Sequence, residues 1–293
     1  MTHPVRPLLA RAVAELREAG IESPEQDARV LLSLVCDIEP ARLPLLDGVS
    51  DEQAELFESM VIKRAVRMPL QHLTGRAYFR HVQLEVGPGV FVPRPETEVM
   101  TGWAIDQLRP MVLAMQRPLV VELCAGSGAI SKALYDELPR RLRLHAVELS
   151  EDAAAWAVRN LHGTTVELHV EDMATALPGL DGSVDLVIAN PPYIPLDAYL
   201  SVAPEVRDHD PALALFSGDD GLDAIRVLTQ VASRLLKPAG LLCFEHADAQ
   251  GESAPAVVSG HGSFTAVRDH RDLAGRPRFT TAVRARLSGR MAG

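Results

Sequence analysis

Four consecutive residues, Asn190-Pro191-Pro192-Tyr193, carry the clearest chemical signal in the sequence. They directly follow residues 184–189, an apolar run typical of a buried strand. Two prolines in succession make a rigid turn without two N–H donors, so nearby carbonyl groups have few internal partners. The side-chain oxygen of Asn190 and the carbonyl of Pro191 could accept both hydrogens of a planar –NH₂ group, on which Tyr193 could stack. The pattern therefore predicts a site for an amino or amide nitrogen; the alternative is an ordinary proline-rich turn.

A second motif, Glu122-Leu-Cys-Ala-Gly-Ser-Gly128, lies where a predicted strand meets a helix. Glycine lets the backbone approach a ligand closely, and the first turn of a helix offers free N–H groups. A dinucleotide fingerprint would need a third glycine where Ser131 stands, which argues against NAD. At the ends of the next two predicted strands, Glu148 could accept the hydroxyls of a ribose and Asp172 could meet an adenine amino group.

These residues must be positioned by strands and helices that alternate along the chain. Strands are predicted over 118–121, 144–147, 165–170, 184–189 and 241–244, helices over 128–138, 151–161 and 219–236, and two closing antiparallel strands over 264–267 and 279–283. Repeated strand–helix units indicate a doubly wound, mainly parallel sheet with helices on both faces and a closing antiparallel hairpin, an α/β fold. Ligands of such sheets bind beyond the carboxyl ends of the strands, where the polar residues above lie.

The first third of the chain differs in pattern. The pattern of residues 1–75 predicts a small all-helical domain, with capping boxes at Ser23 and Ser50. Residues 76–95 are predicted to form a β-hairpin linker. Val82, Leu84 and Val86 alternate before the turn Gly87-Pro88-Gly89, and Val90-Phe91-Val92 is an apolar run after it. The α/β domain is predicted to span 96–293.

Composition narrows the functional classes. The chain has 293 residues, 47% of them hydrophobic and 23% charged, with a net charge of −10, which suits a globular protein and disfavours broad nucleic-acid binding. Three scattered cysteines indicate reduced thiols in a cytoplasmic protein rather than a disulfide framework, and we expect no metal. We also expect no signal peptide, no membrane association and no direct nucleic-acid contact.

Together these motifs resemble a known group of enzymes. The glycine loop followed by Asn-Pro-Pro-Tyr looks like the class I S-adenosylmethionine-dependent methyltransferases that act on planar nitrogens. Further segments narrow the resemblance to the release factor glutamine methyltransferase family. These segments are residues 69–75 (PLQHLTG), 91–98 (FVPRPETE), 204–206 (PEV), 220–222 (DGL) and 272–276 (DLAGR).

The resemblance implies a cofactor, a substrate and a set of site residues. The cofactor would be S-adenosyl-L-methionine, and the substrate the glutamine of the Gly-Gly-Gln motif of class I peptide chain release factors, methylated on its N5 amide by a monomeric enzyme. The helical domain would recognise the substrate, and the segment 91–98 would cover the site. The implied catalytic residues are Asn190, Pro191, Pro192 and Tyr193; the implied cofactor residues are Phe91, Arg94, Thr97, Glu122, Leu123, Cys124, Ala125, Gly126, Gly128, Glu148, Asp172, Met173 and Asn190.

The glycine loop departs from the family pattern at two positions, and three alternative functions remain open. The first loop position is usually Asp and the third often Gly in the family, but here they are Glu122 and Cys124. A ribosomal protein glutamine, a DNA adenine and a non-enzymatic scaffold are the alternatives. The DNA alternative would need a basic channel, whereas the nearest basic cluster, Lys63, Arg64 and Arg67, is interpreted as a solvated helix face.

Overall fold

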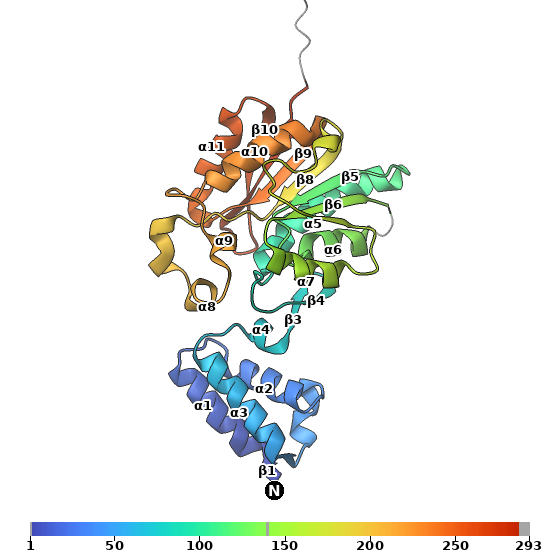
Figure 1. The fold of residues 1–293 in the computed structure, drawn as a ribbon. Coiled ribbons are helices and arrows are strands. Elements are labelled where there is room, and N and C mark those ends of the chain that lie inside the picture. Colours follow the sequence, from blue (N-terminus) through green and yellow to red (C-terminus); the bar gives the residue numbers. More distant parts are fainter. Residues whose placement is uncertain (1, 139–140, 287–293) are drawn as a thin grey trace, which may run out of the picture. The chain divides into compact units, whose positions relative to one another are not determined.

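A computed structural model of the chain describes residues 2–138 and 141–286 (Figure 1). The chain divides into two compact units. One unit comprises Met1–Arg76 together with Val202–His209, and the other comprises Ala77–Ser201 together with Asp210–Gly293. The chain thus leaves the second unit after Ser201, contributes eight residues to the first, and returns at Asp210.

The second unit is built on a seven-stranded sheet of order β10-β11-β9-β8-β5-β6-β7. Its strands are β5 (Leu119–Leu123), β6 (Arg143–Glu148), β7 (Glu167–Val170), β8 (Val184–Ala189), β9 (Leu236–Glu245), β10 (Phe264–Arg271) and β11 (Pro277–Arg284). The first five pair in parallel, while β11 runs antiparallel to both β9 and β10. This confirms the predicted mainly parallel sheet with a closing antiparallel hairpin.

Helices cover both faces of the sheet, as Figure 1 shows. These helices are α5 (Pro95–Leu113), α6 (Ala129–Glu137) and α7 (Glu151–Leu161) on one face, and α10 (Asp223–Leu235) and α11 (Ser253–Gly260) on the other. Each face has its own apolar core, because the central strands are buried on both sides and carry nearly continuous runs of Val, Leu and Ile. The buried strands hold the ends of the connecting loops at fixed positions.

The hairpin before this sheet exists, but its predicted placement was wrong. The paired strands are β3 (Arg76–Phe79) and β4 (Val82–Glu85), which precede the Gly-Pro-Gly sequence instead of flanking it. The alternation of Val82 and Leu84 was correctly interpreted; its partner strand was not, because Val90 and Val92 are buried without forming a ladder. Inward-facing residues of the hairpin, including Phe79 and Leu84, belong to the apolar core of the second unit.

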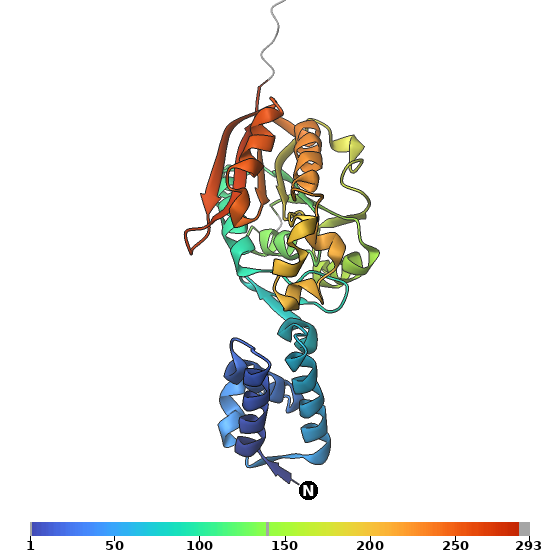
Figure 2. The ribbon, with the colours of Figure 1, turned by 90° about the vertical axis from the view of Figure 1, so that its left-hand side faces the viewer.

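The helices of the first unit lie side by side, as the blue ribbon in Figure 2 shows. They pack around a separate core that includes Leu16, Leu31 and Phe57, all fully buried. Its elements are α1 (Val5–Glu18), α2 (Pro24–Val35), the 3₁₀ helix η1 (Pro40–Leu45), α3 (Asp51–Ala65), α4 (Leu70–Thr74) and α8 (Pro204–Arg207). A short antiparallel pair, β1 (Thr2–Pro4) with β2 (Gly48–Ser50), was not predicted. Ser50 and Gln53 form the predicted capping box, whereas the side chain of Ser23 makes no cap hydrogen bond.

Two members of the basic cluster Lys63, Arg64 and Arg67, which was predicted to be a solvated helix face, belong to a buried ion-pair network in the first unit. Arg64 is only 8% exposed, and its Nε donates to Oδ2 of Asp27 at 2.7 Å. Arg67 donates to Oε1 of Glu205 at 2.9 Å, and Arg64 reaches the same oxygen at 3.4 Å. Because a buried guanidinium must be paired, Arg64 holds α2, α3 and α8 together instead of facing solvent.

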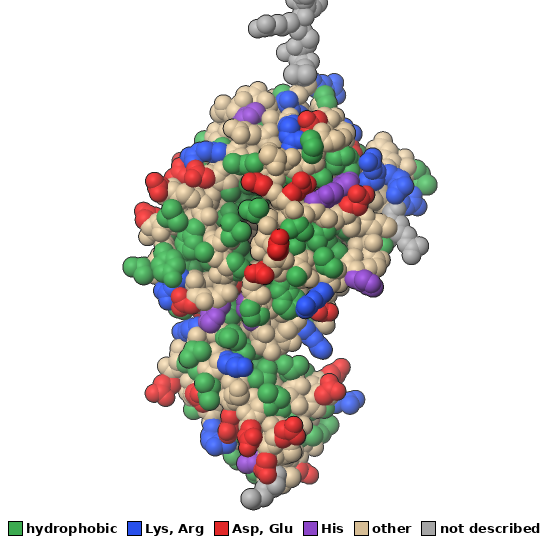
Figure 3. All heavy atoms as spheres, viewed as in Figure 1, with side chains coloured by type: hydrophobic (Ala, Val, Ile, Leu, Met, Phe, Trp, Pro, Cys, Tyr) green, Lys and Arg blue, Asp and Glu red, His purple; other side chains and the backbone are tan. Residues whose placement is uncertain are grey.

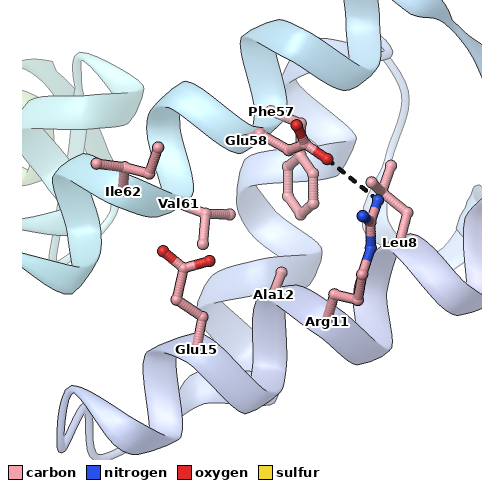
Figure 4. Close-up of a pocket in the computed structure, with 8 residues that line it drawn as sticks. All are labelled: Leu8, Arg11, Ala12, Glu15, Phe57, Glu58, Val61 and Ile62. Atoms are coloured by element: carbon pink, nitrogen blue, oxygen red, sulfur yellow. Dashed lines mark hydrogen bonds and ion pairs between the residues drawn. The ribbon is translucent and has the colours of Figure 1, made fainter.

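A hollow between α1 and α3 of the first unit has a volume of about 300 Å³ (Figure 4). Apolar side chains such as Phe57 and Val61 form part of its lining, and an ion pair between Arg11 and Glu58 crosses its mouth at 3.1 Å. None of the predicted cofactor or amide-binding residues lines it. In the described part of the chain, no helix is both long and apolar enough to cross a membrane.

Candidate active site

The strand order places the two sequence motifs at one edge of the sheet. From β5 the chain proceeds outward to β6 and β7, and then returns to the other side of β5 with β8 and β9. This reversal makes the carboxyl ends of β5 and β8 a topological switch point, the usual ligand position in doubly wound sheets. The glycine loop follows β5 and Asn190 follows β8, so the topology brings them together.

A chain of hydrogen bonds orients the side chain of Asn190. Its Nδ2 lies 3.3 Å from Oγ1 of Thr97, to which it donates, and that hydroxyl donates to Oε2 of Glu245 at 2.6 Å. Because the amide nitrogen is used in this way, Oδ1 of Asn190 is the atom left to accept a hydrogen from a ligand. Thr97 is buried at the start of α5, and Glu245 ends β9, only 1% exposed.

Glu245 also binds Tyr193, whose hydroxyl donates to Oε1 at 3.0 Å. One buried carboxylate therefore holds both the Asn190 and the Tyr193 ends of the motif. Burial raises the pKa of Glu245, while the hydrogen bonds from Thr97 and Tyr193 act in the opposite direction. Burial likewise raises the pKa of the Tyr193 phenol, so it remains a hydrogen-bond donor. Glu245 directly follows the predicted strand 241–244, but no motif in the sequence marks it as a site residue.

Two further residues support the backbone of the motif. Nε2 of Gln250 donates to the carbonyl oxygen of Tyr193 at 3.0 Å. Gly221 approaches the same carbonyl so closely that an added Cβ would lie 2.3 Å from the oxygen, and its φ of +73° favours glycine. The Asp-Gly-Leu segment identified by resemblance therefore packs against the turn after β8. Gln250 gave no signal in the sequence.

The segment 91–98, predicted to cover the site, makes two separate sets of contacts. Thr97 joins the Asn190 network, as described above. The guanidinium of Arg94 lies over the ring of Phe91, 5.0 Å from its centroid, and donates to Oδ2 of Asp210 at 2.8 Å. The segment is thus attached to the loop that rejoins the second unit at Asp210.

The glycine loop has the backbone conformation of a ligand cradle. Cys124, Gly126 and Gly128 all have positive φ, at 58°, 55° and 77°. An added Cβ at Gly126 would meet nothing within 4 Å, so this backbone faces open space, while one at Gly128 would press on Leu161 at 3.1 Å. Gly126 therefore leaves room for a ligand, and Gly128 is required for close packing of α7.

Two carboxylates hold this loop from different sides. Glu148 accepts hydrogen bonds from the backbone N–H of Gly126 at 2.7 Å and of Ser150 at 2.8 Å. Each of its oxygens retains a lone pair that could accept a ribose hydroxyl. Glu122, in strand β5, is only 1% exposed. It accepts hydrogen bonds from both the backbone N–H and the side-chain hydroxyl of Ser131.

Desolvation raises the pKa of Glu122 to about 8, although the hydrogen bonds from Ser131 oppose this shift. The side chain binds the first turn of α6, and Glu122 thus supports the cradle through the helix. Leu123 and Ala125 are buried beside it.

Cys124 lies beside Met173, next to the end of β7. The thiol of Cys124 is 3.7 Å from the sulfur of Met173, while Asp172 is exposed and accepts from the N–H of Ala174 at 2.8 Å. Burial raises the pKa of the Cys124 thiol far above its usual value, so the reactive thiolate form is suppressed. Its left-handed backbone is one that glycine adopts without strain. The open face at Gly126, the free lone pairs of Glu148 and the exposed Asp172 fit a nucleoside with an amino-acid tail.

The fold and the site define the class of this protein. Residues 120–209 match the model of a methyltransferase domain, and residues 7–75 match the PrmC N-terminal domain. The second unit is accordingly a class I methyltransferase whose cofactor is S-adenosyl-L-methionine, preceded by a helical domain.

The similarity to curated proteins is more specific. A release factor glutamine methyltransferase from Streptomyces coelicolor is 52% identical over 94% of this chain and 97% of that protein. One from Mycobacterium tuberculosis is 44% identical over 96% of this chain and 91% of that protein. A 4-amino-L-phenylalanine/4-methylamino-L-phenylalanine methyltransferase from Streptomyces pristinaespiralis is 39% identical over 89% of this chain and 94% of that protein. The chain belongs to the release factor glutamine methyltransferase family.

The Glu245 network gives a first prediction. In Glu245→Gln one of the two hydrogen bonds from Thr97 and Tyr193 is lost, because an –NH₂ group cannot accept it. Leaving a buried donor unsatisfied costs about 1–3 kcal/mol, so kcat should fall roughly 10- to 100-fold, with cofactor affinity unchanged. Steady-state kinetics and calorimetric cofactor binding measure both quantities.

Thr97 provides the matched control for this network. Thr97→Ser keeps the hydroxyl and should retain most of kcat, whereas Thr97→Ala should resemble Glu245→Gln. Wild-type kcat in Glu245→Gln would contradict the positioning role, and equal losses of kcat and cofactor binding would assign Glu245 to general stability.

Glu122 gives a prediction of pH dependence. The pKa of Glu122 is about 8 in the folded protein, whereas the ordinary value is 4.5. Between pH 4.5 and pH 8 the folded protein therefore holds a proton on Glu122 that the unfolded chain has lost. For this reason the free energy of unfolding falls as the pH rises through this range. Glu122→Gln mimics the protonated acid, and its melting temperature relative to wild type should therefore rise from pH 5 to pH 9. Calorimetry across this range measures the difference.

The exposed Glu151 on α7 is the control. Glu151→Gln should follow the wild-type pH profile, and a constant offset between Glu122→Gln and wild type would rule out a proton held at Glu122.

Proposed function

We propose that this protein transfers the methyl group of S-adenosyl-L-methionine to the N5 amide nitrogen of the glutamine in the Gly-Gly-Gln motif of class I peptide chain release factors. The observation that carries the proposal is the orientation of Asn190. Its amide nitrogen is engaged by Thr97, so its oxygen is presented as a hydrogen-bond acceptor beside a cofactor cradle. Membership of the glutamine methyltransferase family supports the choice of an amide.

The residues of the turn would act by alignment. An amide nitrogen is a weak nucleophile because its lone pair is delocalised into the carbonyl. Oδ1 of Asn190 and the carbonyl oxygen of Pro191 would each accept one hydrogen of the –NH₂ group and favour a pyramidal nitrogen. Tyr193 would support the flat side chain, and Pro192 would keep the turn rigid. Such positioning can contribute about 7–11 kcal/mol to lowering a barrier.

The cofactor would lie along the glycine loop. S-adenosyl-L-methionine supplies a methyl group already activated by the positive sulfonium sulfur. Glu148 would accept the ribose hydroxyls, Asp172 and Met173 would contact the adenine, and the loop from Glu122 to Gly128 would border the amino-acid end. Phe91 and Arg94 would cover the site together with Thr97.

A small aromatic amine is the second candidate substrate. The relative from Streptomyces pristinaespiralis is named for methylation of 4-amino-L-phenylalanine, and an arylamine presents the same planar nitrogen. Glutamine remains the first choice because closer relatives carry the release factor name. DNA adenine is disfavoured because Arg64 and Arg67 are engaged by acidic partners, and on the face drawn in Figure 3 most basic side chains lie among acidic ones.

The decisive experiment incubates the purified protein with S-adenosyl-L-methionine and an intact class I release factor, and maps the product by peptide mass spectrometry. We expect one methyl group on the Gly-Gly-Gln glutamine. Asn190→Ala should lower the rate by roughly 10²–10³, as expected when a preorganised polar contact is removed. Its cofactor affinity should be unchanged, which shows that the variant is folded.

Parallel reactions with 4-amino-L-phenylalanine and with a glutamine-containing ribosomal protein test the alternatives. If either of these substrates is methylated and the release factor is not, the proposed substrate is wrong, although methyl transfer to a planar nitrogen still holds. Cofactor binding with no transfer to any of them would favour the scaffold alternative.

We infer that the helical unit, assigned to residues 1–75 from the sequence, docks the release factor. The hollow between α1 and α3 supports this role, because it combines apolar walls with charged residues at its rim. Ile62 at its edge is 58% exposed, as expected for a contact residue in a protein interface. The linker 76–95 and the methyltransferase domain 96–293 would then present the reactive site to the same partner.

Ile62→Glu tests the docking role. We expect a raised KM for the intact release factor and an unchanged kcat/KM for a short Gly-Gly-Gln peptide, because only the protein substrate reaches the hollow. Leu273→Glu, at a residue 96% exposed in the second unit, is the control and should leave both values unchanged. Equal effects of Ile62→Glu on both substrates would contradict docking at this hollow.

We further infer a monomer that acts in the cytoplasm, where release factors work, and that contacts its protein partner directly without nucleic acid. The net charge of −10 supports the last point, because it disfavours binding to a phosphate backbone.

A further inference from the structure

Three side chains with metal-binding atoms meet at the outer edge of the sheet. His145 lies on β6, while Glu167 and His169 lie on β7, the last strand in the sheet order. Nδ1 of His145 is 3.1 Å from Nε2 of His169 and 3.7 Å from Oε2 of Glu167. All three ligand atoms lie within 4.8 Å of one another.

The strand register explains why these side chains converge. His145 is the direct neighbour of Glu167 in the parallel ladder between β6 and β7. Glu167 and His169 are two residues apart on β7 and therefore project from the same face of the sheet. The backbone, held by the buried strand β6, thus brings two imidazoles and a carboxylate together without any loop.

The two distances from His145 are close to those that a tetrahedral metal requires. Zinc binds imidazole nitrogen and carboxylate oxygen at about 2.0–2.2 Å, so ligand atoms around one ion lie roughly 3.3–3.5 Å apart. The two distances from Nδ1 of His145, at 3.1 and 3.7 Å, bracket this value. Two histidines with one carboxylate are also a donor set that zinc uses, with the fourth position open to water.

Access and burial fit the same interpretation. His145 is only 8% exposed, His169 is half-buried, and the side chain of Glu167 is 69% exposed. An ion can therefore enter from the Glu167 side and reach a histidine that the sheet already holds in place. Imidazole ligands favour zinc and other late first-row metals over magnesium or calcium.

We propose that His145, Glu167 and His169, at the edge of the sheet, form a binding site for Zn²⁺ or a similar divalent metal ion. This replaces the expectation, drawn from the cysteine spacing, that the protein holds no metal. The ion would join β6 to the edge strand β7 by coordinate bonds in addition to the ladder. Because His145 precedes Glu148 by three residues and His169 precedes Asp172 by three, the bound ion would stabilise the strands that end at the proposed cofactor carboxylates.

Titration of chelator-treated, full-length protein with zinc against a chromophoric chelator tests the site. We expect one equivalent to bind, with a raised melting temperature. Removing a partner outside the ligand set costs about 10–100-fold in affinity at metal sites, so His169→Ala should lose at least about 100-fold and Glu167→Gln a smaller factor. Cobalt(II) should give the visible absorption of a four-coordinate site, and His169→Ala should abolish it.

Two control variants separate this site from other zinc ligands. His162→Ala removes an exposed histidine on the same unit, and Cys36→Ser removes a half-buried thiol. Both should bind zinc as wild type does.

Two outcomes would overturn the proposal. The first is no zinc binding by wild type, which would leave a direct imidazole–imidazole hydrogen bond as the reason for the 3.1 Å contact. The second is zinc binding that survives His169→Ala, whatever the effect of Cys36→Ser. Neither outcome bears on methyl transfer, so this test is independent of the proposed function.

Discussion

A single buried carboxylate, that of Glu245, is the constraint on which the Asn190–Tyr193 turn depends. It ends the inner strand β9 and accepts hydrogen bonds from Thr97 and Tyr193, two residues separated by almost a hundred positions. A carboxylate without access to water is stable only when such donors satisfy it. The same requirement that stabilises the core therefore fixes the orientation of Asn190, through Thr97. Stability and chemistry share one interaction.

The cofactor side of the site is organised by shorter-range interactions. Glu122 binds the N–H of Ser131 only nine residues away, and Glu148 binds Gly126 at the end of the adjacent strand. Helix starts and tight turns leave free N–H groups, and acidic residues at strand ends satisfy them. Because this geometry arises from one strand–loop–helix unit and its neighbour, it is strongly reflected in the local sequence.

The structure differs from expectation at three places in the chain. Val90 and Val92 were interpreted as a strand from their apolar pattern, but they are buried without a partner strand. Ser23 has the sequence of a capping box and lacks the hydrogen bond, because its backbone has φ −124° and ψ 57°. Arg64 was assigned to a solvated face, although Asp27 and Glu205 bury it. At Arg64 partners distant in the chain decide the outcome, whereas at Ser23 the local backbone conformation does.

The sequence by itself determined the alternation of strands and helices, the glycine loop and the Asn-Pro-Pro-Tyr turn, because hydrophobic periodicity and the geometry of Gly and Pro act over a few residues. Only the tertiary structure decided which polar groups support that turn, and it brought His145 beside His169 across two strands. Glu245 and Gln250 carry no local mark of their role, since their partner Tyr193 lies more than fifty positions away. Which groups meet at a site depends on strand order and register, which are set by the packing of the whole sheet.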